Sequence, residues 1–350
     1  MIICISTVLQ GAMPQFATEI YKALKANNVP VKLCLPVSDK ISLEDISNED
    51  VIRYEYPETV TNKREIALKV LKTIESVDNP ELWFCDETTL SMIMAKKCIY
   101  SYKVFVHDPN PHKYTFNLRR VLRLFYINYS KRRVYQKAKG IVLMSNSSKA
   151  VFLNNNQSYM AKTQLLLLGA HLSQYTEAVP DELLDNMDYF LFFGAIEKYK
   201  NLRGLLSAYS KYRGNRKLVV AGKGVLSDEE KELLKLCGDK VVLINRFIQD
   251  QEMITLFRRC TVTILPYIEA TQSGVIPMSY HFAKPVIVSD LPGLAEFVES
   301  GKTGYVYHNE PELIHYMETI DNDYELLCKN AEKYEHDKLN FTKNVISLIN

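Results

Sequence analysis

The chain has 350 residues, of which 47% are hydrophobic and 24% charged, as expected for a globular protein large enough for two domains. Its 43 lysines and arginines nearly match its 41 aspartates and glutamates, which argues against a general nucleic-acid-binding protein. The seven cysteines lack metal-ligand spacing and indicate reduced thiols, and no apolar run suits a signal peptide or a membrane-spanning helix, so we expect a cytoplasmic protein.

The first half of the chain alternates predicted strands and helices. A buried strand over residues 2–8 leads into a loop with Gly11 and Pro14, then a helix over 17–26 and a strand over 31–35. Such a β-loop-α-β unit begins a doubly wound sheet. Four more strands are predicted over residues 81–85, 103–106, 141–144 and 164–168, with helical stretches between them.

A basic segment breaks the charge balance of the chain. Residues 113–139 hold nine basic side chains and no acidic one, interleaved with aromatic residues. One interpretation is a solvated helix packed through its apolar side. The other is a surface that binds acceptor or anionic membrane headgroups. That surface would consist of Arg119, Arg120, Arg123, Lys131, Arg132 and Arg133.

The second half repeats the alternation after a polar linker. Apolar periodicity weakens around residues 172–188 and then resumes. Strands are predicted over residues 189–193, 217–221, 241–244, 261–265 and 285–289, and helices over 202–212, 228–236, 251–258 and 275–283. From residue 310 to the end the pattern is almost wholly helical. Two successive alternations predict an α/β protein with two Rossmann-like domains facing a central cleft.

The stretch from Thr261 to Tyr307 has the pattern of a binding site. A Thr/Ser/Gly loop over residues 270–274 separates a strand from a helix. Because the carboxyl ends of parallel strands face the ligand crevice, such a loop can hold an anionic group with its hydroxyls, its amides and the helix dipole.

Three stretches together resemble the family-4 glycosyltransferases, the retaining glycosyl transferases of group 1. They are residues 192–201 (FFGAIEKYKN), residues 265–274 with 284–306 (LPYIEATQSG and KPVIVSDLPGLAEFVESGKTGYV), and residues 106–112 (VHDPNPH). The loop places the chain with a subset of the family that has a Pro-Tyr-x-x-Ala-Thr-Gln-Ser-Gly form. The resemblance implies the GT-B fold.

The resemblance also implies a domain organisation. Residues 1–172 would form the acceptor-side domain, 173–188 the linker and 189–325 the nucleotide-sugar-binding domain. Helices over residues 326–350 would pack back toward the first domain. No metal or other cofactor is implied, and the Asp321-Asn322-Asp323 triplet is interpreted as helix-terminal rather than as a metal motif.

Residue roles follow from the same resemblance. Lys200 matches the phosphate-binding lysine of the family, although it could be an ordinary surface lysine. His107 matches an active-site histidine, although a structural core histidine is the alternative, and Glu296 is a further candidate for sugar contact. The other predicted diphosphate-binding residues are Gly194, Thr271, Gln272, Ser273 and Gly274. Further candidates are Glu269, Lys198, Gly11 and Ala12 for donor sugar or phosphate, and Asn245, Arg246 and Phe247 for the base.

The sequence departs from the family at three positions. Ala270 and Met278 stand where two glutamates are expected, and Ala195 stands where the family has an arginine. Glu269 and Lys198 are their candidate replacements. These departures leave sugar recognition open.

The expected function is therefore transfer of a hexose from a UDP- or GDP-sugar to a growing, lipid-linked glycan or polysaccharide. The chain would work in the cytoplasm, at the inner face of the cell membrane as a peripheral protein. A catalytically degenerate nucleotide-binding scaffold is the main alternative, and a nucleotide-sugar epimerase or hydrolase is another.

Overall fold

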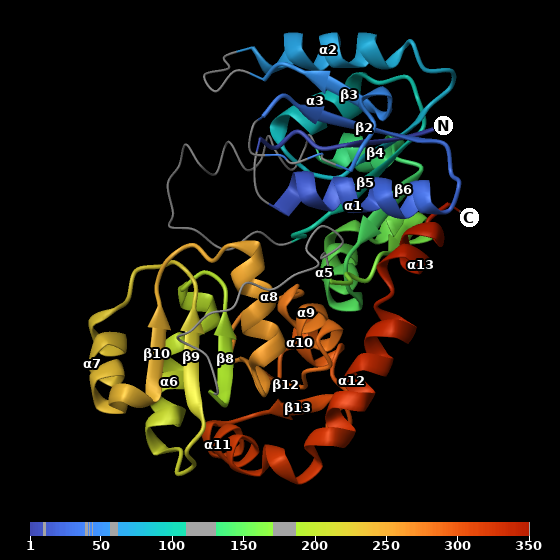
Figure 1. The fold of residues 1–350 in the computed structure, drawn as a ribbon. Helices are drawn as coiled ribbons and strands as arrows, with labels where there is room; N and C mark the ends of the chain where they lie inside the picture. Colours follow the sequence, from blue (N-terminus) through green and yellow to red (C-terminus); the bar gives the residue numbers. More distant parts are fainter. Residues whose placement is uncertain are drawn as a thin grey trace. The chain divides into compact units, whose positions relative to one another are not determined.

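The structure, a computed structural model, describes residues 1–9, 12–38, 41, 43, 45–56, 62–109, 131–170 and 187–349. The chain forms two compact units (Figure 1). Unit 1 contains Met1–Leu167 and Phe341–Asn350, and unit 2 contains Leu168–Asn340. The predicted linker over residues 173–188 lies almost wholly outside the described residues.

Unit 1 is built on a parallel sheet of strand order β3-β2-β1-β4-β5-β6-β7. The strands are β1 (Ile2–Ile5), β2 (Val31–Pro36), β3 (Val51–Tyr54), β4 (Glu81–Phe84), β5 (Tyr102–Val106), β6 (Gly140–Leu143) and β7 (Thr163–Leu165). The helices are α1 (Ala12–Ala26), α2 (Lys63–Ile74), α3 (Thr89–Lys97), α5 (Asn146–Asn156) and α13 (Phe341–Ile346), with another over residues 131–137.

Both faces of this sheet are covered, which explains why its strands are almost uniformly apolar. Ile3 and Ile5 of β1 share one core cluster with residues of α2, α3 and α5. On α1, Phe16 packs against Phe105 of β5 with ring centroids 5.8 Å apart, and Phe105 in turn contacts Trp83 of β4. The carboxyl edge of the sheet is thereby left for polar residues.

A buried lysine ties the end of the chain to unit 1. Lys103 of β5 is 3% exposed, and its ammonium lies 5.3 Å from the centre of the Trp83 ring. It donates to Gln164 Oε1 at 2.9 Å and to the carbonyl oxygen of Leu348. Gly140 leaves room for this lysine, because a Cβ there would lie 3.2 Å from the Lys103 side chain. A strand of unit 1 therefore holds residues that follow unit 2 in the sequence.

Unit 2 has a second parallel sheet, of order β10-β9-β8-β11-β12-β13. Its strands are β8 (Tyr189–Phe193), β9 (Lys217–Ala221), β10 (Val241–Ile244), β11 (Val262–Leu265), β12 (Val286–Ser289) and β13 (Gly304–Tyr307). Its α-helices are α6 (Leu202–Lys211), α7 (Asp228–Cys237), α8 (Asp250–Arg259), α9 (Val275–His281), α10 (Pro292–Ala295), α11 (Glu310–Thr319) and α12 (Tyr324–Lys338).

Alternate residues of β8 point to opposite faces of this sheet, as the period of two in a strand requires. Phe190 and Phe192 join the core cluster formed with α6 and α11, whereas Tyr189 and Leu191 join the cluster formed with α8. Helices thus cover both faces (Figure 1). The predicted α/β class with two parallel sheets is confirmed.

Sequence patterns located three strands of unit 2 with the right bounds and missed two edge strands. Residues 189–193, 217–221 and 241–244 form strands with the predicted bounds. The strands β3 and β13 were not predicted, and each lies at an edge of its sheet. Their apolar runs are shorter than that of the edge strand β10, since β3 contains Arg53 and β13 begins with Gly304. Of the C-terminal helices, α12 contacts α9 within unit 2, and α13 contacts α1 within unit 1.

Candidate active site

The sheet of unit 2 has a switch point between β8 and β11. From β8 the chain proceeds outward through β9 and β10, and after crossing back it proceeds the other way through β11, β12 and β13. Ligands of open α/β sheets bind outside the carboxyl ends of the strands at such a point. The two loops that leave it, residues 194–201 and 266–274, contain most of the predicted diphosphate-binding residues.

Two glycines allow the backbone to pack closely at this edge. Gly194, directly after β8, has φ +103°, and a Cβ there would lie 2.3 Å from the Lys200 ammonium. Gly222, directly after β9, has φ +152°, and a Cβ there would lie 2.0 Å from the carbonyl oxygen of Gly194. Glycine is favoured at Gly194 by its positive φ and is required at Gly222, where a side chain would collide with backbone. Gly194 therefore makes the space that Lys200 occupies.

Lys200 lies buried in the short 3-10 turn η4 (Lys198–Lys200) and is 8% exposed. Its ammonium donates to the carbonyl oxygen of Phe193 at 3.2 Å and lies 5.2 Å from the centre of the Tyr267 ring. Burial lowers the pKa of Lys200 to about 8, while the nearby Glu197 carboxylate opposes that shift. An ordinary surface lysine would not be held in this way.

Asn201 fastens the Lys200 turn to the adjacent strand. It adopts the left-handed conformation with φ 53°, which asparagine tolerates better than most residues. Its side chain caps α6 by accepting from the Gly204 amide at 3.2 Å and donates to the Pro266 carbonyl at 3.1 Å. One residue thus ends the turn, starts the helix and ties both to the end of β11.

The predicted anion loop, residues 270–274, lies beside the Lys200 turn through Tyr267. The Tyr267 hydroxyl is hydrogen-bonded to the Ser273 side chain, and its carbonyl accepts from Ser289 Oγ at 2.6 Å. The Ile268 amide donates to the Tyr199 carbonyl at 2.8 Å. Thr271, Gln272 and Ser273 are half-buried and Gly274 is exposed. The structure therefore brings the predicted lysine and the predicted loop to one edge of unit 2.

The loop after β12 supports the anion loop from the other side. A Cβ at Gly293 would lie 2.5 Å from the carbonyl oxygen of Ala270, so only glycine permits this approach. Glu296 directly follows the short helix α10, at its C-terminal end. Its side chain is half-buried.

The predicted replacements for the missing family residues are both exposed. Glu269 and Lys198 have exposed side chains, and Ala195 is exposed as well. Met278, in contrast, is 8% exposed and belongs to the core cluster under α8. The position at which a second glutamate was expected from the resemblance is thus part of the apolar core.

The predicted base-binding residues follow β10. Asn245 accepts from the Gly224 amide at 3.0 Å and donates to the Gly224 carbonyl at 3.1 Å, so its amide is used to hold the loop after β9. Arg246 forms two hydrogen bonds with the Glu252 carboxylate, at 2.6 and 2.8 Å. Phe247 is 68% exposed. Of the three side chains, the phenyl ring presents the largest apolar surface to solvent.

Unit 1 has its own switch point, between β1 and β4, and a buried carboxylate occupies it. Asp86, 3% exposed, accepts from the Thr7 amide at 2.6 Å, the Thr7 hydroxyl at 2.8 Å, the Ser6 hydroxyl at 3.1 Å and the Thr88 amide at 3.2 Å. The sequence prediction missed this residue. The signal was an acidic residue immediately after a buried strand, which is the position that the carboxyl edge of a sheet gives to functional or bridging side chains.

His107 follows β5 at the same edge of unit 1. Its Nε2 lies 2.8 Å from the carbonyl oxygen of Cys85, and because a carbonyl can only accept, Nε2 carries the proton. Burial lowers the pKa of His107 despite the nearby carboxylates of Glu87 and Asp86, so the ring is held neutral with its lone pair on Nδ1. Phe16 packs against the ring with centroids 4.9 Å apart.

Part of the basic segment is described. Glu87, next to Asp86, accepts from the Tyr135 hydroxyl at 2.5 Å and pairs with the Lys131 ammonium at 3.1 Å. Tyr135 is buried, whereas Arg132 and Arg133 are exposed on the same helix over residues 131–137. The predicted residues Arg119, Arg120, Arg123 and Gly11 lie outside the described residues. Ala12 is described, as the exposed first residue of α1.

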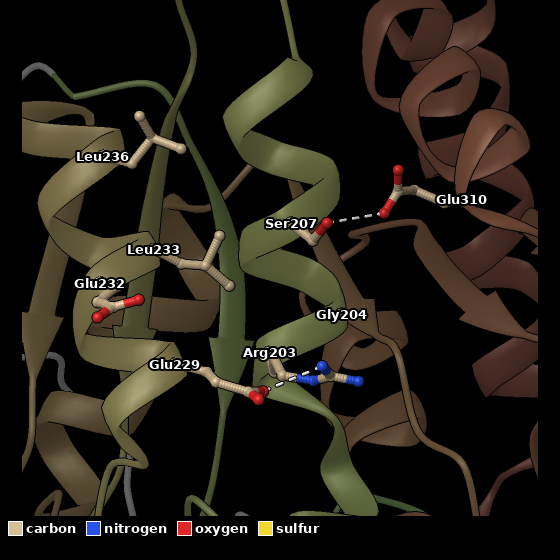
Figure 2. Close-up of a pocket in the computed structure, with 8 residues that line it drawn as sticks. All are labelled: Arg203, Gly204, Ser207, Glu229, Glu232, Leu233, Leu236 and Glu310. Carbon is tan, nitrogen blue, oxygen red and sulfur yellow. Dashed lines mark hydrogen bonds and ion pairs between the residues drawn. The ribbon is translucent and has the colours of Figure 1, made fainter.

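A pocket of about 520 Å³ lies elsewhere on unit 2, between α6, α7 and the start of α11. In its lining, Arg203 donates to the Glu229 carboxylate at 3.0 Å, and Ser207 donates to the Glu310 carboxylate at 2.9 Å (Figure 2). None of its lining residues belongs to the loops after β8 and β11. It is therefore separate from the candidate donor site.

The described residues contain no group of three or more His, Cys, Asp or Glu side chains that could hold a metal ion. Within those same residues, none of the helices combines the length and the apolar character that spanning a membrane requires. The Asp321 carboxylate of the Asp-Asn-Asp triplet accepts from Arg216 at 2.8 Å.

Comparison with known proteins finds one matching family model and solved structures with a similar fold. Residues 188–323 match the model of the glycosyl transferases group 1. A search of the curated proteins finds no match. Solved structures match the whole chain at low identity, and such a likeness bears on the fold alone.

Three of these structures are representative. A glycosyltransferase from Rickettsia africae is 14% identical with a TM-score of 0.75, covering 99% of this chain and 96% of its own. Anabaena HepE in complex with UDP and glucose is 14% identical with a TM-score of 0.73, covering 99% and 98%. The lipopolysaccharide outer core galactosyltransferase WaaB is 13% identical with a TM-score of 0.66, covering 100% and 99%.

These likenesses confirm the predicted GT-B fold and the predicted glycosyltransferase domain. The matched residues include β8 with the Lys200 turn and β11 with the anion loop. Unit 2 of this chain thus carries a glycosyl transferases group 1 domain, and the fold of the whole chain is that of the GT-B glycosyltransferases.

Proposed function

We propose that the chain is a retaining, metal-independent glycosyltransferase that moves a hexose from a nucleotide diphosphate-sugar to a growing, lipid-linked glycan. The observation that carries the proposal is the buried Lys200 ammonium beside the hydroxyl-rich loop 270–274 at the switch point of unit 2. A group 1 domain over the same residues supports it.

The chemistry of the donor site follows from the charge that develops on the leaving diphosphate. Breaking the bond between the sugar and the diphosphate leaves negative charge on the phosphate oxygens, which a pre-positioned cation and hydrogen-bond donors stabilise. Lys200 supplies the cation, Thr271 and Ser273 supply hydroxyls, and Gln272, Gly274 and Gly194 supply amide groups. A lysine that is already desolvated interacts more strongly with phosphate than one in water.

Unit 1 supplies the acceptor side in this proposal. His107, which the structure places at the carboxyl edge of the unit 1 sheet, is the candidate for stabilising the reacting sugar or the acceptor. Glu296, Glu269 and Lys198 of unit 2 are the candidates for contact with sugar hydroxyls or phosphate. Gly11 and Ala12 are the corresponding candidates in the first loop of unit 1.

The donor is a UDP- or GDP-sugar, and the neighbouring structures favour UDP. HepE has been solved with UDP, with UDP-glucose, and with UDP and glucose, and its fold matches the whole of this chain. The exposed Phe247 ring offers a flat surface to a base, with Asn245 and Arg246 supporting the loops on either side.

A panel of nucleotides tests the donor site. Thermal shift with UDP, GDP, ADP and TDP should identify one preferred base, and the matching nucleotide-sugars should then be assayed for transfer and for hydrolysis. Lys200→Ala should lower turnover at least tenfold, the scale of losing one charged phosphate contact. Lys235→Ala, which removes an exposed lysine of α7, is the matched control. Equal turnover in the two variants would remove Lys200 from the site.

A catalytically degenerate scaffold is the second candidate function, favoured by the position of Met278. This residue replaces a family glutamate and is buried in the core, so no carboxylate reaches the sugar from that position. Nucleotide binding without either transfer or hydrolysis, across glycan and lipid-linked acceptors, would support the scaffold. Hydrolysis of the donor without transfer would instead support a hydrolase.

An anionic membrane surface is the proposed location of the acceptor. Arg132 and Arg133 are exposed on the described end of the basic segment, and each basic residue near an acidic leaflet adds about 1 kcal/mol of binding. Binding to phosphatidylserine vesicles should therefore weaken between 50 mM and 500 mM salt, and Arg132→Ala/Arg133→Ala should weaken it further. Equal partitioning onto neutral and anionic vesicles would contradict this location at the inner membrane face.

A further inference from the structure

Tyr267 joins three parts of the candidate donor site. It follows β11 directly after Pro266 and is 4% exposed. Its ring faces the Lys200 ammonium, its hydroxyl is hydrogen-bonded to Ser273, and its carbonyl accepts from Ser289, the last residue of β12. The residue thus contacts the loops that leave β8 and β11 and the end of β12.

The buried Lys200 ammonium contacts the Tyr267 ring and the carbonyl oxygen of Phe193. Lys200 Nζ lies 5.2 Å from the centre of the Tyr267 ring, within the range of a cation–π interaction. Tyr199 packs edge-on against the same ring with centroids 5.8 Å apart, which restrains its orientation. Among the described residues, the ammonium is held by this ring and the Phe193 carbonyl rather than by a carboxylate. A cation held this loosely keeps its charge available for another anion.

The hydroxyl end of Tyr267 fixes the other half of the site. Its bond to Ser273 lies in the loop whose hydroxyls are proposed to meet the diphosphate. Ser273 Oγ also accepts from the Val275 amide at 3.2 Å, at the start of α9. The distance between the cation and the serine hydroxyl is therefore set by one rigid aromatic side chain.

We propose that Tyr267 is a positioning residue of the donor site, whose ring holds the Lys200 ammonium and whose hydroxyl orients Ser273, so that both are presented together to an anionic diphosphate. The proposal rests on the proposed function of this site. Tyr267 itself makes no bond to the diphosphate in this arrangement.

The arrangement makes nucleotide affinity depend on pH. The ionisable groups beside Lys200 are Glu197 and Lys198 of its own turn, with Tyr199 and Tyr267. Burial raises the pKa values of both tyrosines, so they stay neutral across the working range. Because burial lowers the pKa of Lys200 to about 8, the free protein loses this proton as pH rises past that value. Affinity for UDP should therefore be steady below about pH 7.5 and fall by up to tenfold per pH unit above about 8.

Two variants separate the roles of the ring and the hydroxyl. Tyr267→Phe keeps the ring, so UDP affinity measured by calorimetry should fall about three- to tenfold. The pH above which UDP affinity begins to fall, called the pH break below, should stay unchanged. Tyr267→Leu removes the ring as well, so affinity should fall more than tenfold and the break should move to lower pH by about half to one unit. An unchanged break in the Leu variant would overturn the role of the ring.

The hydroxyl role is tested by a double-mutant cycle with Ser273→Ala. If the two hydroxyls act as one unit, the Phe and Ala changes together should cost no more UDP affinity than the larger single change. Simple addition of the two effects would overturn this half of the proposal. The pair remains informative even if the Leu variant fails to fold.

Tyr209→Phe is the control for a merely structural effect. Its hydroxyl donates to the carbonyls of Arg216 at 2.9 Å and Lys240 at 3.0 Å, before the amino ends of β9 and β10 and so at the opposite edge of the sheet. The variant should lose stability comparable to that lost by Tyr267→Phe, yet keep the UDP affinity and the pH break of the wild type.

A ligand-free readout separates this proposal from the function that it rests on. Acetylation of Lys200 by acetic anhydride, followed by mass spectrometry over pH 6.5–9.5, reports its titration without nucleotide. The midpoint should be lower in Tyr267→Leu and unchanged in Tyr267→Phe. If the wild type binds no nucleotide, the donor-site function fails while this shift still tests the contact between ring and ammonium. Equal midpoints in both variants would reject that contact.

Discussion

The two units place opposite charges at equivalent positions of their sheets. At the switch point of unit 1, Asp86 is buried and accepts hydrogen bonds from Ser6, Thr7 and Thr88. At the switch point of unit 2, Lys200 is buried and contacts one carbonyl and one ring. Hydrogen-bond donors of unit 1 surround the first charge, whereas the second has weaker partners and is offset only in part by the Glu197 carboxylate.

The difference indicates which unit can attract a phosphate. A carboxylate with several donors has its charge stabilised inside the protein and serves to fix the loops after β1 and β4. An ammonium held by an aromatic face is desolvated, and the nearby Glu197 carboxylate offsets that cost only in part, which is why the pKa of Lys200 is lowered. An anionic ligand would replace the interactions with water that the Lys200 ammonium lost on burial. Binding an anion should therefore stabilise unit 2 more than unit 1.

The largest effect should come from neutralising the carboxylate of unit 1. Asp86→Asn replaces an acceptor of several hydrogen bonds by an amide whose NH₂ faces donors, which should lower the free energy of unfolding by about 2–4 kcal/mol. Urea unfolding followed by Trp83 fluorescence measures this directly, because the chain has a single tryptophan and it is buried in β4 of unit 1.

Asp45→Asn provides the matched control for that variant. Asp45 has a side chain 72% exposed and pairs with Lys22 at 3.6 Å, so its neutralisation should change stability by less than about 0.5 kcal/mol. Equal stabilities of the two variants would show that the Asp86 network is not a structural element of unit 1.

Neutralising Lys200 of unit 2 should raise, rather than lower, the free energy of unfolding. Lys200→Met removes a buried charge and keeps most of the side-chain volume, so the free energy of unfolding of unit 2 should rise by about 1–3 kcal/mol at pH 7. The lowered pKa destabilises the folded state below about pH 8, and this penalty disappears between about 8 and the unfolded value of 10.5. Scanning calorimetry should show the advantage of the variant shrinking across that window. Loss of stability at pH 7 would mean that Lys200 is a structural residue.

The smallest effect should come from Glu197, which is exposed and only partly offsets the lowered pKa of Lys200. Glu197→Gln should move the pH break of UDP affinity downward by a few tenths of a unit at low salt. In 1 M salt the shift should vanish, since screening acts strongly on exposed charges. A shift that persists at high salt would indicate that the variant changes the turn itself.

The fold was largely predictable because buried parallel strands have a plain pattern. The strands β8, β9 and β10 match their predicted bounds, since their apolar runs end at glycine or polar residues. The edge strands β3 and β13 were not predicted, because Arg53 interrupts the apolar run of β3 and β13 consists of a glycine, two tyrosines and a single valine. Strand order also follows from pairing over long separations, which residue types do not specify.

The site was predictable only in part. Lys200 and the loop 270–274 were identified because lysine, threonine, serine and glycine suit a phosphate whatever the detailed geometry. Asp86 was missed, and the partner of Asn245 could not be anticipated, because such contacts join segments that are separated in the sequence. The role of Tyr267 was equally hidden, since a tyrosine after a strand has the same letter whether it faces solvent or a buried ammonium.

The contact between Lys103 and Leu348 has a consequence for biosynthesis. A ribosome completes β5 long before it reaches the last residues, so the Lys103 ammonium must stay without the carbonyl of Leu348 while the whole of unit 2 is made. Unit 1 therefore cannot reach its final packing as an N-terminal domain folding first on the ribosome. Its order of assembly is inverted, with the inserted unit 2 free to fold while unit 1 waits for the residues from Phe341 onward.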